Sequence, residues 1–222
     1  MRSPFAPVPL LIFIALILLL LSIVQVGAIT IAFDKLGLSA SSAIALLMAS
    51  LIGSGINLPL FTLRTEEPPR DIFPLLSRGL LRVPPLPFTG TTLITLNVGG
   101  GLIPGAFSLY LVVHTPITAM EALLATALLA GISYAASRPI ANIGIGMPVL
   151  IAPLCAALIA ILINPEHSAP LAYVCGTLGV LLGADILRLN DIRLMGVPTA
   201  SIGGAGTFDG IFITGVIAVL LA

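Results

Sequence analysis

The stretch ASIGGAGTFDG (200–210) leads into a final apolar run, IFITGVIAVLLA (211–222). As a helix the run would extend about 18 Å, whereas the hydrocarbon core of a bilayer is about 30 Å thick. To cross that core, the helix has to begin near Gly203. We therefore expect the glycine-rich lead-in to enter the membrane and to carry Asp209 about 9 Å inside the boundary.

The composition predicts a membrane protein throughout. Of 222 residues, 58% are hydrophobic and only 8% are charged, and the mean hydropathy is +1.20. Soluble domains carry about 25% charged residues, so this chain is typical of a polytopic membrane protein in the cell membrane. The formal net charge is zero, which gives no reason to expect a nucleic-acid partner.

Seven apolar segments are close to the length of about 20 residues that a membrane span needs. We predict a single domain over 1–222, an all-α bundle of seven transmembrane helices in the lipid bilayer. The polar segment between spans two and three predicts an amphipathic helix near Asp71 to Arg82 that lies on the membrane surface; an ordered loop is the alternative. The predicted spans are 9–32, 39–62, 91–113, 116–136, 143–163, 170–189 and 203–222.

The basic residues predict the orientation of this bundle. With the N-terminus in the cytoplasm, eight arginines lie on the cytoplasmic side and only Lys35 lies on the outer side, which satisfies the positive-inside rule. The eight are Arg2, Arg64, Arg70, Arg78, Arg82, Arg138, Arg188 and Arg193.

A layer of polar residues is expected near the inner ends of the spans. Asp185 in span six should lie about 6 Å from the cytoplasmic boundary, at nearly the depth of Asp209 on the next, antiparallel helix. Such residues normally face the bundle interior or a water-filled cavity. The same layer is expected to hold Asn57, Asn97, Asn142, Asn190 and Asp191.

Four glycine clusters fall near this layer: GSG (53–55), GGG (99–101), GIG (144–146) and GGAG (203–206). They favour broken helices that line a cavity. A helix start at GGAG would present N–H groups to an anion, so Gly203, Gly204, Gly206 and Thr207 are expected to bind substrate. A pattern Pro-x-Ala-(Asn/Ser)-Ile-Gly recurs at 139–144 and 198–203, which suggests a duplicated helical hairpin.

Two resemblances follow from these stretches. Asp185 in LLGAD and Asp209 in GAGTFDG, on consecutive predicted spans, resemble the pair in diaspartyl intramembrane proteases of the presenilin and prepilin-peptidase type, although neither lies in that family's Gly-x-Gly-Asp motif. The whole chain more closely resembles an uncharacterised prokaryotic membrane family, domain of unknown function 1614. That resemblance rests on IANIGIGMPVLIAP (140–153), LLGADILRL (181–189) and VPTASIGGAGTFDGIFITGVIAVLLA (197–222).

Three kinds of function remain open from the sequence. The first is a membrane-embedded hydrolase that uses Asp185 and Asp209 as acid and base, with Asn97 and Asn142 orienting a small-molecule, lipid or peptide substrate. In a second form of this function, Asp185, Asp191 and Asp209 bind Mg²⁺ or another hard divalent cation. The alternatives are an ion-coupled transporter that uses the same aspartates, and a structural membrane scaffold.

Overall fold

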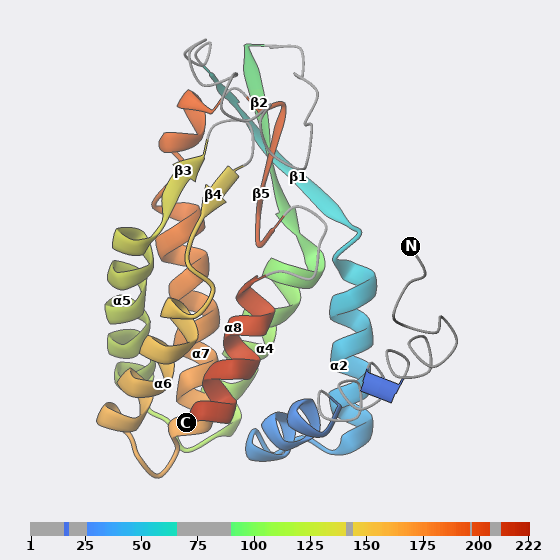
Figure 1. The fold of residues 1–222 in the computed structure, drawn as a ribbon, viewed down its shortest axis with the longest axis vertical. Coiled ribbons are helices and arrows are strands. Elements are labelled where there is room, and N and C mark those ends of the chain that lie inside the picture. Colours follow the sequence, from blue (N-terminus) through green and yellow to red (C-terminus); the bar gives the residue numbers. More distant parts are fainter. Residues whose placement is uncertain (1–15, 18–25, 66–89, 141–143, 196, 205–209) are drawn as a thin grey trace, which may run out of the picture.

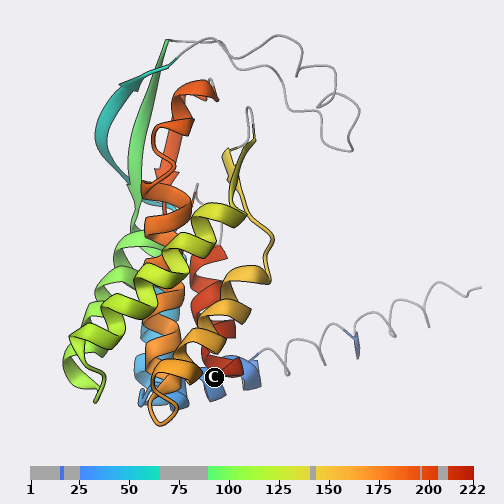
Figure 2. The same ribbon diagram turned by 90° about the vertical axis from the view of Figure 1, so that its left-hand side faces the viewer.

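Helices and strands occupy opposite ends of the molecule in the computed structural model, which describes residues 16–17, 26–65, 90–140, 144–195, 197–204 and 210–222. The α-helices form the lower part of the view in Figure 1, and the strands gather at the upper end beside the 3₁₀ turn Asp191–Leu194. The view turned by 90° shows the same division (Figure 2). The chain is therefore mainly helical, as expected, but it also contains strands that the sequence analysis did not expect.

The first described helices form a sharp bend. Helix Val26–Lys35 meets α2 (Ala40–Gly53) at an angle of 111°. Ser39 caps α2 by accepting a hydrogen bond from Ser42 N. The other described α-helices are α4 (Ile103–His114), α5 (Ala119–Ala136), α6 (Ile151–Ile163), α7 (Ser168–Val180) and α8 (Gly210–Leu221). Short π-helical turns precede α4 (Val98–Leu102) and follow α7 (Leu181–Ile186), and a 3₁₀ turn covers Asp191–Leu194.

Helix α7 forms the centre of the helical part. It contacts α4, α5, α6 and α8, and almost all of its residues are buried. Small side chains allow this close packing: a Cβ on Gly176 would lie 3.5 Å from Ala156 Cβ and 3.7 Å from Ala218 Cβ. Lipid tails are as apolar as leucine, so helix association in a bilayer depends on such contacts between small residues.

Three strands make a small mixed sheet in the order β1-β2-β5. Strand β1 (Asn57–Arg64) pairs antiparallel with β2 (Thr91–Asn97), with a bulge between Pro59 and Phe61. Strand β5 (Thr199–Ile202) pairs parallel with β2, with Leu93 opposite Thr199 and Leu96 opposite Ile202. Strands β3 (Arg138–Ile140) and β4 (Gly144–Gly146) form a separate antiparallel pair.

These strands correct three predicted spans. Residues 57–62, 91–97 and 144–146 were assigned to helical spans and are extended in the structure. Leu58–Leu63 and Thr91–Leu96 are rich in threonine, leucine and aromatic or β-branched residues, and Pro59 inside a helix would cost about 3 kcal/mol. A window of mean hydropathy does not separate a short apolar strand from part of an apolar helix.

Two described helices are long and apolar enough to cross a membrane. They are Ala119–Ala136, and Ser168–Ile186 with its π turn; the bent pair Val26–Lys35 and Ala40–Gly53 would add a third if it forms one span. Helices α2, α6 and α8 have 12 to 14 residues and extend only about 18–21 Å. The structure is thus compatible with a membrane protein, but the helices of the described residues alone do not give seven full spans.

The start of the final helix also differs from the expectation. Helix α8 begins at Gly210 and not near Gly203, where β5 (Thr199–Ile202) has just ended. Gly203 and Gly204 then take positive φ angles of 81° and 88°, which belong to a turn rather than to a right-handed helix. The prediction assumed a continuous helix, whereas an extended chain rises about 3.3 Å per residue and covers the same depth with fewer residues.

Candidate functional site

Asp185 lies where the central helix changes its winding. It belongs to the π-helical turn Leu181–Ile186 at the end of α7, and its side chain is half-buried. Its Oδ2 accepts a hydrogen bond of 2.8 Å from Gly203 N. The structure therefore brings together two residues of the predicted site, a carboxylate and the first glycine of GGAG. π turns within α-helices are frequent at functional sites.

Gly203 sits in a junction that has room only for glycine. A Cβ at this position would lie 2.5 Å from Gly101 N, and one at Gly99 would overlap Ser50 O. Gly53 in turn lies against Gly99 N, where a Cβ would be 3.0 Å away. Three of the four predicted glycine clusters thus meet in one place, as close backbone contacts. The fourth, Gly144–Gly146, forms β4.

Asn97 joins several backbone segments at the same junction. Its Nδ2 donates to Ser54 O (2.7 Å) and to Asn57 Oδ1 (3.1 Å), and its Oδ1 accepts from Gly100 N (2.7 Å). The residue is 1% exposed. These bonds hold the end of α2, the end of β2 and the following π turn together, so the observed role of Asn97 is structural.

Ser201 completes this network and was not singled out from the sequence. Its Oγ donates to Asn57 Oδ1 at 2.8 Å, which ties β5 to the start of β1. The signal that could have found it is the repeated Pro-x-Ala-(Asn/Ser)-Ile-Gly pattern, in which Ser201 takes the place of Asn142. Asn142 itself lies outside the described residues.

Asp191, a predicted metal ligand, has a different partner. Its Oδ2 forms a salt bridge of 2.7 Å with Arg188 Nη1. Arg188 also donates to Tyr134 O and to Ser137 O, and its guanidinium lies 4.1 Å from the centre of the Tyr134 ring. Asp191 therefore supports a cluster that closes the C-terminal end of α5. Within the described ranges, no group of three His, Cys, Asp or Glu residues could hold a metal ion.

Asp209, Gly206 and Thr207 lie outside the described residues, and Asp209 directly precedes α8. The packing of α8 against α7 locates the start of α8. Ser168 Oγ donates to Ala222 O at 3.0 Å at one end of the pair. At the other end, Ile211 shares a cluster with Val180, Leu181 and Ala184. The first turn of α8 is thus about one helical turn, roughly 5–6 Å, from the level of Asp185.

Together these features define a mainly helical protein with two or three segments able to cross a bilayer and a glycine-rich polar junction at one end of its central helix. The chain belongs to the family described as Protein of unknown function (DUF1614), which it matches over residues 51–221. The match confirms the family resemblance seen in the sequence. No curated protein and no solved structure matches this chain.

Proposed function

We propose that this chain is a multi-pass protein of the cell membrane. The support is the outer surface of the helices, which carries many exposed large apolar side chains. Isolated apolar residues are common on soluble proteins, but extended apolar surfaces of this kind mark contact with lipid or with a partner. Examples in which more than half of the residue's surface is exposed are Ile44, Ile52, Leu109, Val113, Met120, Leu123, Leu154, Leu158 and Leu162.

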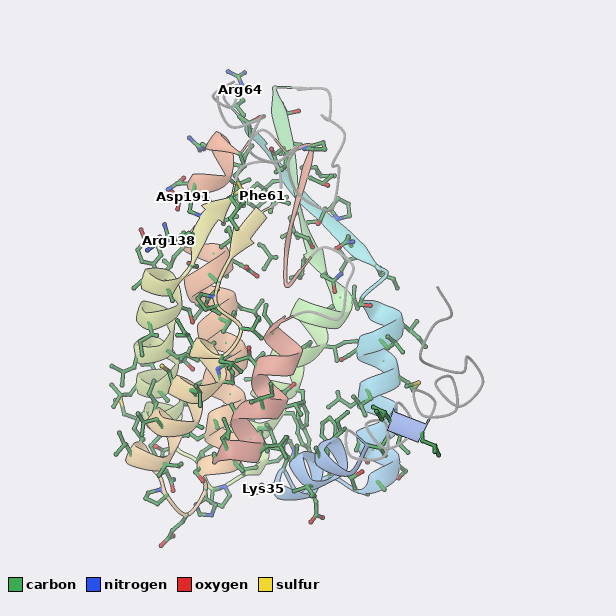
Figure 3. All side chains as sticks on the ribbon, viewed as in Figure 1. Lys35, Phe61, Arg64, Arg138 and Asp191 are labelled. Carbon is green, nitrogen blue, oxygen red and sulfur yellow. The ribbon has the colours of Figure 1, made fainter. Side chains whose placement is uncertain are left out.

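In this proposal the end with the strands faces the cytoplasm. Arg64 and Arg138 lie at that end, and Lys35 lies at the opposite end (Figure 3). Arg188 precedes the 3₁₀ turn Asp191–Leu194 near the strands, and Arg193 lies within it. This distribution supports the orientation expected from the positive-inside rule.

We further propose that the chain is a hydrolase whose reaction uses Asp185 and Asp209. The observation that carries this proposal is the hydrogen bond from Gly203 N to Asp185 Oδ2. Gly203 begins the segment that leads to Asp209 six residues later. The hydrogen bond therefore ties Asp185 to the start of that segment. The start of α8 also packs beside the turn that carries Asp185, because Ile211 shares an apolar cluster with Leu181 and Ala184.

The chemistry of such a pair is acid–base catalysis. One carboxylate takes a proton from a water molecule that attacks the substrate, and the other carboxyl group gives a proton to the leaving group. A second form of the proposal places Mg²⁺ or another hard divalent cation between Asp185 and Asp209, where it would activate the water. The substrate class is a small molecule, a lipid or a peptide that reaches the cytoplasmic end of the bundle.

The test is hydrolysis by the purified full-length protein in detergent, with and without Mg²⁺. The probes are fluorescein-labelled casein, p-nitrophenyl phosphate and p-nitrophenyl butyrate. We expect D185N and D209N each to lower the rate at least about 100-fold, the usual contribution of an acid or base. D34N is the matched control, because Asp34 is exposed at the opposite end of the molecule. A D185N/D209N variant as active as wild type would exclude this catalytic role.

A second candidate function, ion-coupled transport, is favoured by the two π-helical turns. Val98–Leu102 leads into α4 and contains Gly101, and Leu181–Ile186 follows α7 and contains Asp185. Gly203 lies against Gly101 and donates to Asp185, so both turns meet at this glycine. Broken helices beside buried carboxylates are typical of secondary transporters. Proteoliposomes with an internal pH dye distinguish the two functions. A proton flux that D185N removes, without hydrolysis of any probe, supports transport. If the wild-type protein is inactive in both assays, the remaining function is that of a structural membrane scaffold.

A further inference from the structure

A second potential site lies at the end of the molecule opposite the strands. A cavity of about 490 Å³ opens there between three loops and the C-terminal end of α8. The loops are Lys35–Gly37 before α2, Thr115–Pro116 between α4 and α5, and Pro165–His167 between α6 and α7. Small-molecule sites usually have volumes of about 300–1,000 Å³, so this cavity has a suitable size.

The cavity carries both signs of charge. Lys35 and Glu166 line it and are both exposed, and the half-buried His167 lies beside Glu166. In the part of the chain that the structure describes, Lys35 and Glu166 form no salt bridge with each other; the described salt bridge joins Arg188 and Asp191. The two opposite charges can therefore each interact with a ligand.

The structure holds the cationic side of this cavity in place. Lys35 Nζ donates to Val219 O at 3.3 Å and to Leu220 O at 3.4 Å, at the C-terminal end of α8. A lysine ammonium has three N–H donors, so these two contacts leave one donor for a ligand.

The loop that carries Glu166 and His167 is also fixed. His167 N donates to Asn164 Oδ1 (3.1 Å), and Asn164 Nδ2 donates to Glu121 Oε1 (3.2 Å). Glu121 in turn belongs to the capping box that begins α5. The loop is thus tied to a long helix, which positions its side chains before a ligand arrives.

We propose that this cavity binds a small zwitterion, with the ammonium group of the ligand at Glu166 and its anionic group at Lys35 and His167. A ligand with only one kind of charge would face one repulsive side chain, whereas a zwitterion complements both. The ammonium-and-anion chemistry has two sources: a soluble molecule such as an amino acid, or the ethanolamine phosphate headgroup of a lipid. The site is separate from the proposed aspartate pair, and in the proposed orientation it faces the outside.

The experiment uses the full-length protein in nanodiscs made only of phosphatidylglycerol. Titration calorimetry measures the binding of O-phosphoethanolamine and glycine, with inorganic phosphate and ethanolamine as ligands of a single charge. We expect at least one zwitterion to bind about tenfold more tightly than either single-charge ligand. Equal binding of phosphate or ethanolamine, or no binding of either zwitterion, would overturn the proposal.

Two variants test the residues. E166Q and K35M should each weaken zwitterion binding about tenfold, whereas D34N, next to Lys35 but absent from the cavity lining, should not change it. K35M also removes the contacts with α8, so its melting temperature is measured alongside. E166Q leaves those contacts intact, and unchanged binding by E166Q would refute the assignment of Glu166.

A change of lipid identifies the source of the zwitterion. If the lipid headgroup occupies the cavity, nanodiscs that contain phosphatidylethanolamine should weaken binding of the soluble zwitterion to wild type but should have little effect on E166Q. If the soluble molecule is the ligand, the two kinds of nanodisc should give the same affinity. Either result supports a zwitterion site, provided that the binding depends on Glu166.

Discussion

Arg188 shows how a single side chain connects separate parts of this protein. Its guanidinium donates to Tyr134 O at 2.6 Å, to Ser137 O at 2.8 Å and to Asp191 Oδ2 at 2.7 Å, and it stacks over the Tyr134 ring. The two carbonyls belong to the last turn of α5, where a cation also interacts favourably with the helix dipole. The side chain thus links the end of α5 to the segment that follows the π turn Leu181–Ile186.

Replacing this guanidinium should lower stability even when the charge is kept. A lysine in R188K cannot make the same fork of hydrogen bonds or the same stacking contact. We expect R188K to lower the free energy of unfolding by about 1–3 kcal/mol, measured by thermal unfolding in detergent. R193K is the matched control, because Arg193 lies on the nearby 3₁₀ turn Asp191–Leu194 and is exposed. Equal effects of the two variants would contradict a special role for Arg188.

Single residues also show the limits of sequence reasoning. The sequence predicted Asp185, Asn97 and the glycine clusters in one layer, because charged side chains are few in so apolar a chain. In the structure Gly203 N donates to Asp185, and Gly203 lies against Gly101. The sequence could not show that Asn97 bonds to backbone from α2 and from the π turn. That role depends on which backbone atoms meet in three dimensions, and residue type alone does not reveal it.

The elements of this protein combine short helices with extended segments. Helix α2 runs into β1 after the turn at 54–56, and β2 runs directly into the π turn before α4. The apolar stretches were found from the sequence, but their division into helix and strand was not. Pairing between β2 and β5 fixes that division, and the partners are more than one hundred residues apart, with Thr92 and Val197 separated by 105. A local window does not contain this information.

The junction between α2 and the turn after β2 gives a prediction for these elements. A side chain at Gly99 would overlap the backbone at Ser50 and Ser54, which cannot move without disturbing α2. We expect G99A to destabilise the protein by about 3 kcal/mol or more. G105A is the control: a Cβ at Gly105 in α4 would meet nothing within 4 Å. Alanine is the better helix former, so G105A should stabilise by up to about 1 kcal/mol.

Both glycine variants can be compared by thermal unfolding in the same detergent. A G99A protein as stable as wild type would show that α2 and the π turn do not approach as closely as described. It would also mean that a close contact with α2 does not require the glycine at position 99 of the GGG sequence.

At the scale of the whole molecule, the opposite ends differ in chemistry. The end with the strands holds Arg64 and Arg138, whereas the other end holds Lys35 and the open cavity, which Glu166 also lines. Two proposed sites with different chemistry would therefore face opposite sides of the membrane. The family match, over residues 51–221, includes the aspartate pair and Glu166 but not Lys35.

Cysteine labelling tests this orientation. In a background without Cys155 and Cys175, a single exposed cysteine is placed at one end by S41C or at the other end by N190C. A membrane-impermeant maleimide should label S41C in intact cells but should label N190C only after the cells are opened. The reverse pattern would contradict the proposed orientation. Labelling of both variants in intact cells would contradict the crossing of a membrane.

The parallel pairing of β2 with β5 has a consequence for biosynthesis. Ribosomes add about 5–20 residues per second, and β5 follows β2 by about one hundred residues. The synthesis of β5 is therefore completed roughly 5–20 s after that of β2. During that interval β2 can pair with β1, which is already synthesised. The edge of β2 that will later bind β5 stays open. Stalling or truncation before β5 would leave a nascent chain with an exposed strand edge, the kind of surface that chaperones and quality-control proteases recognise.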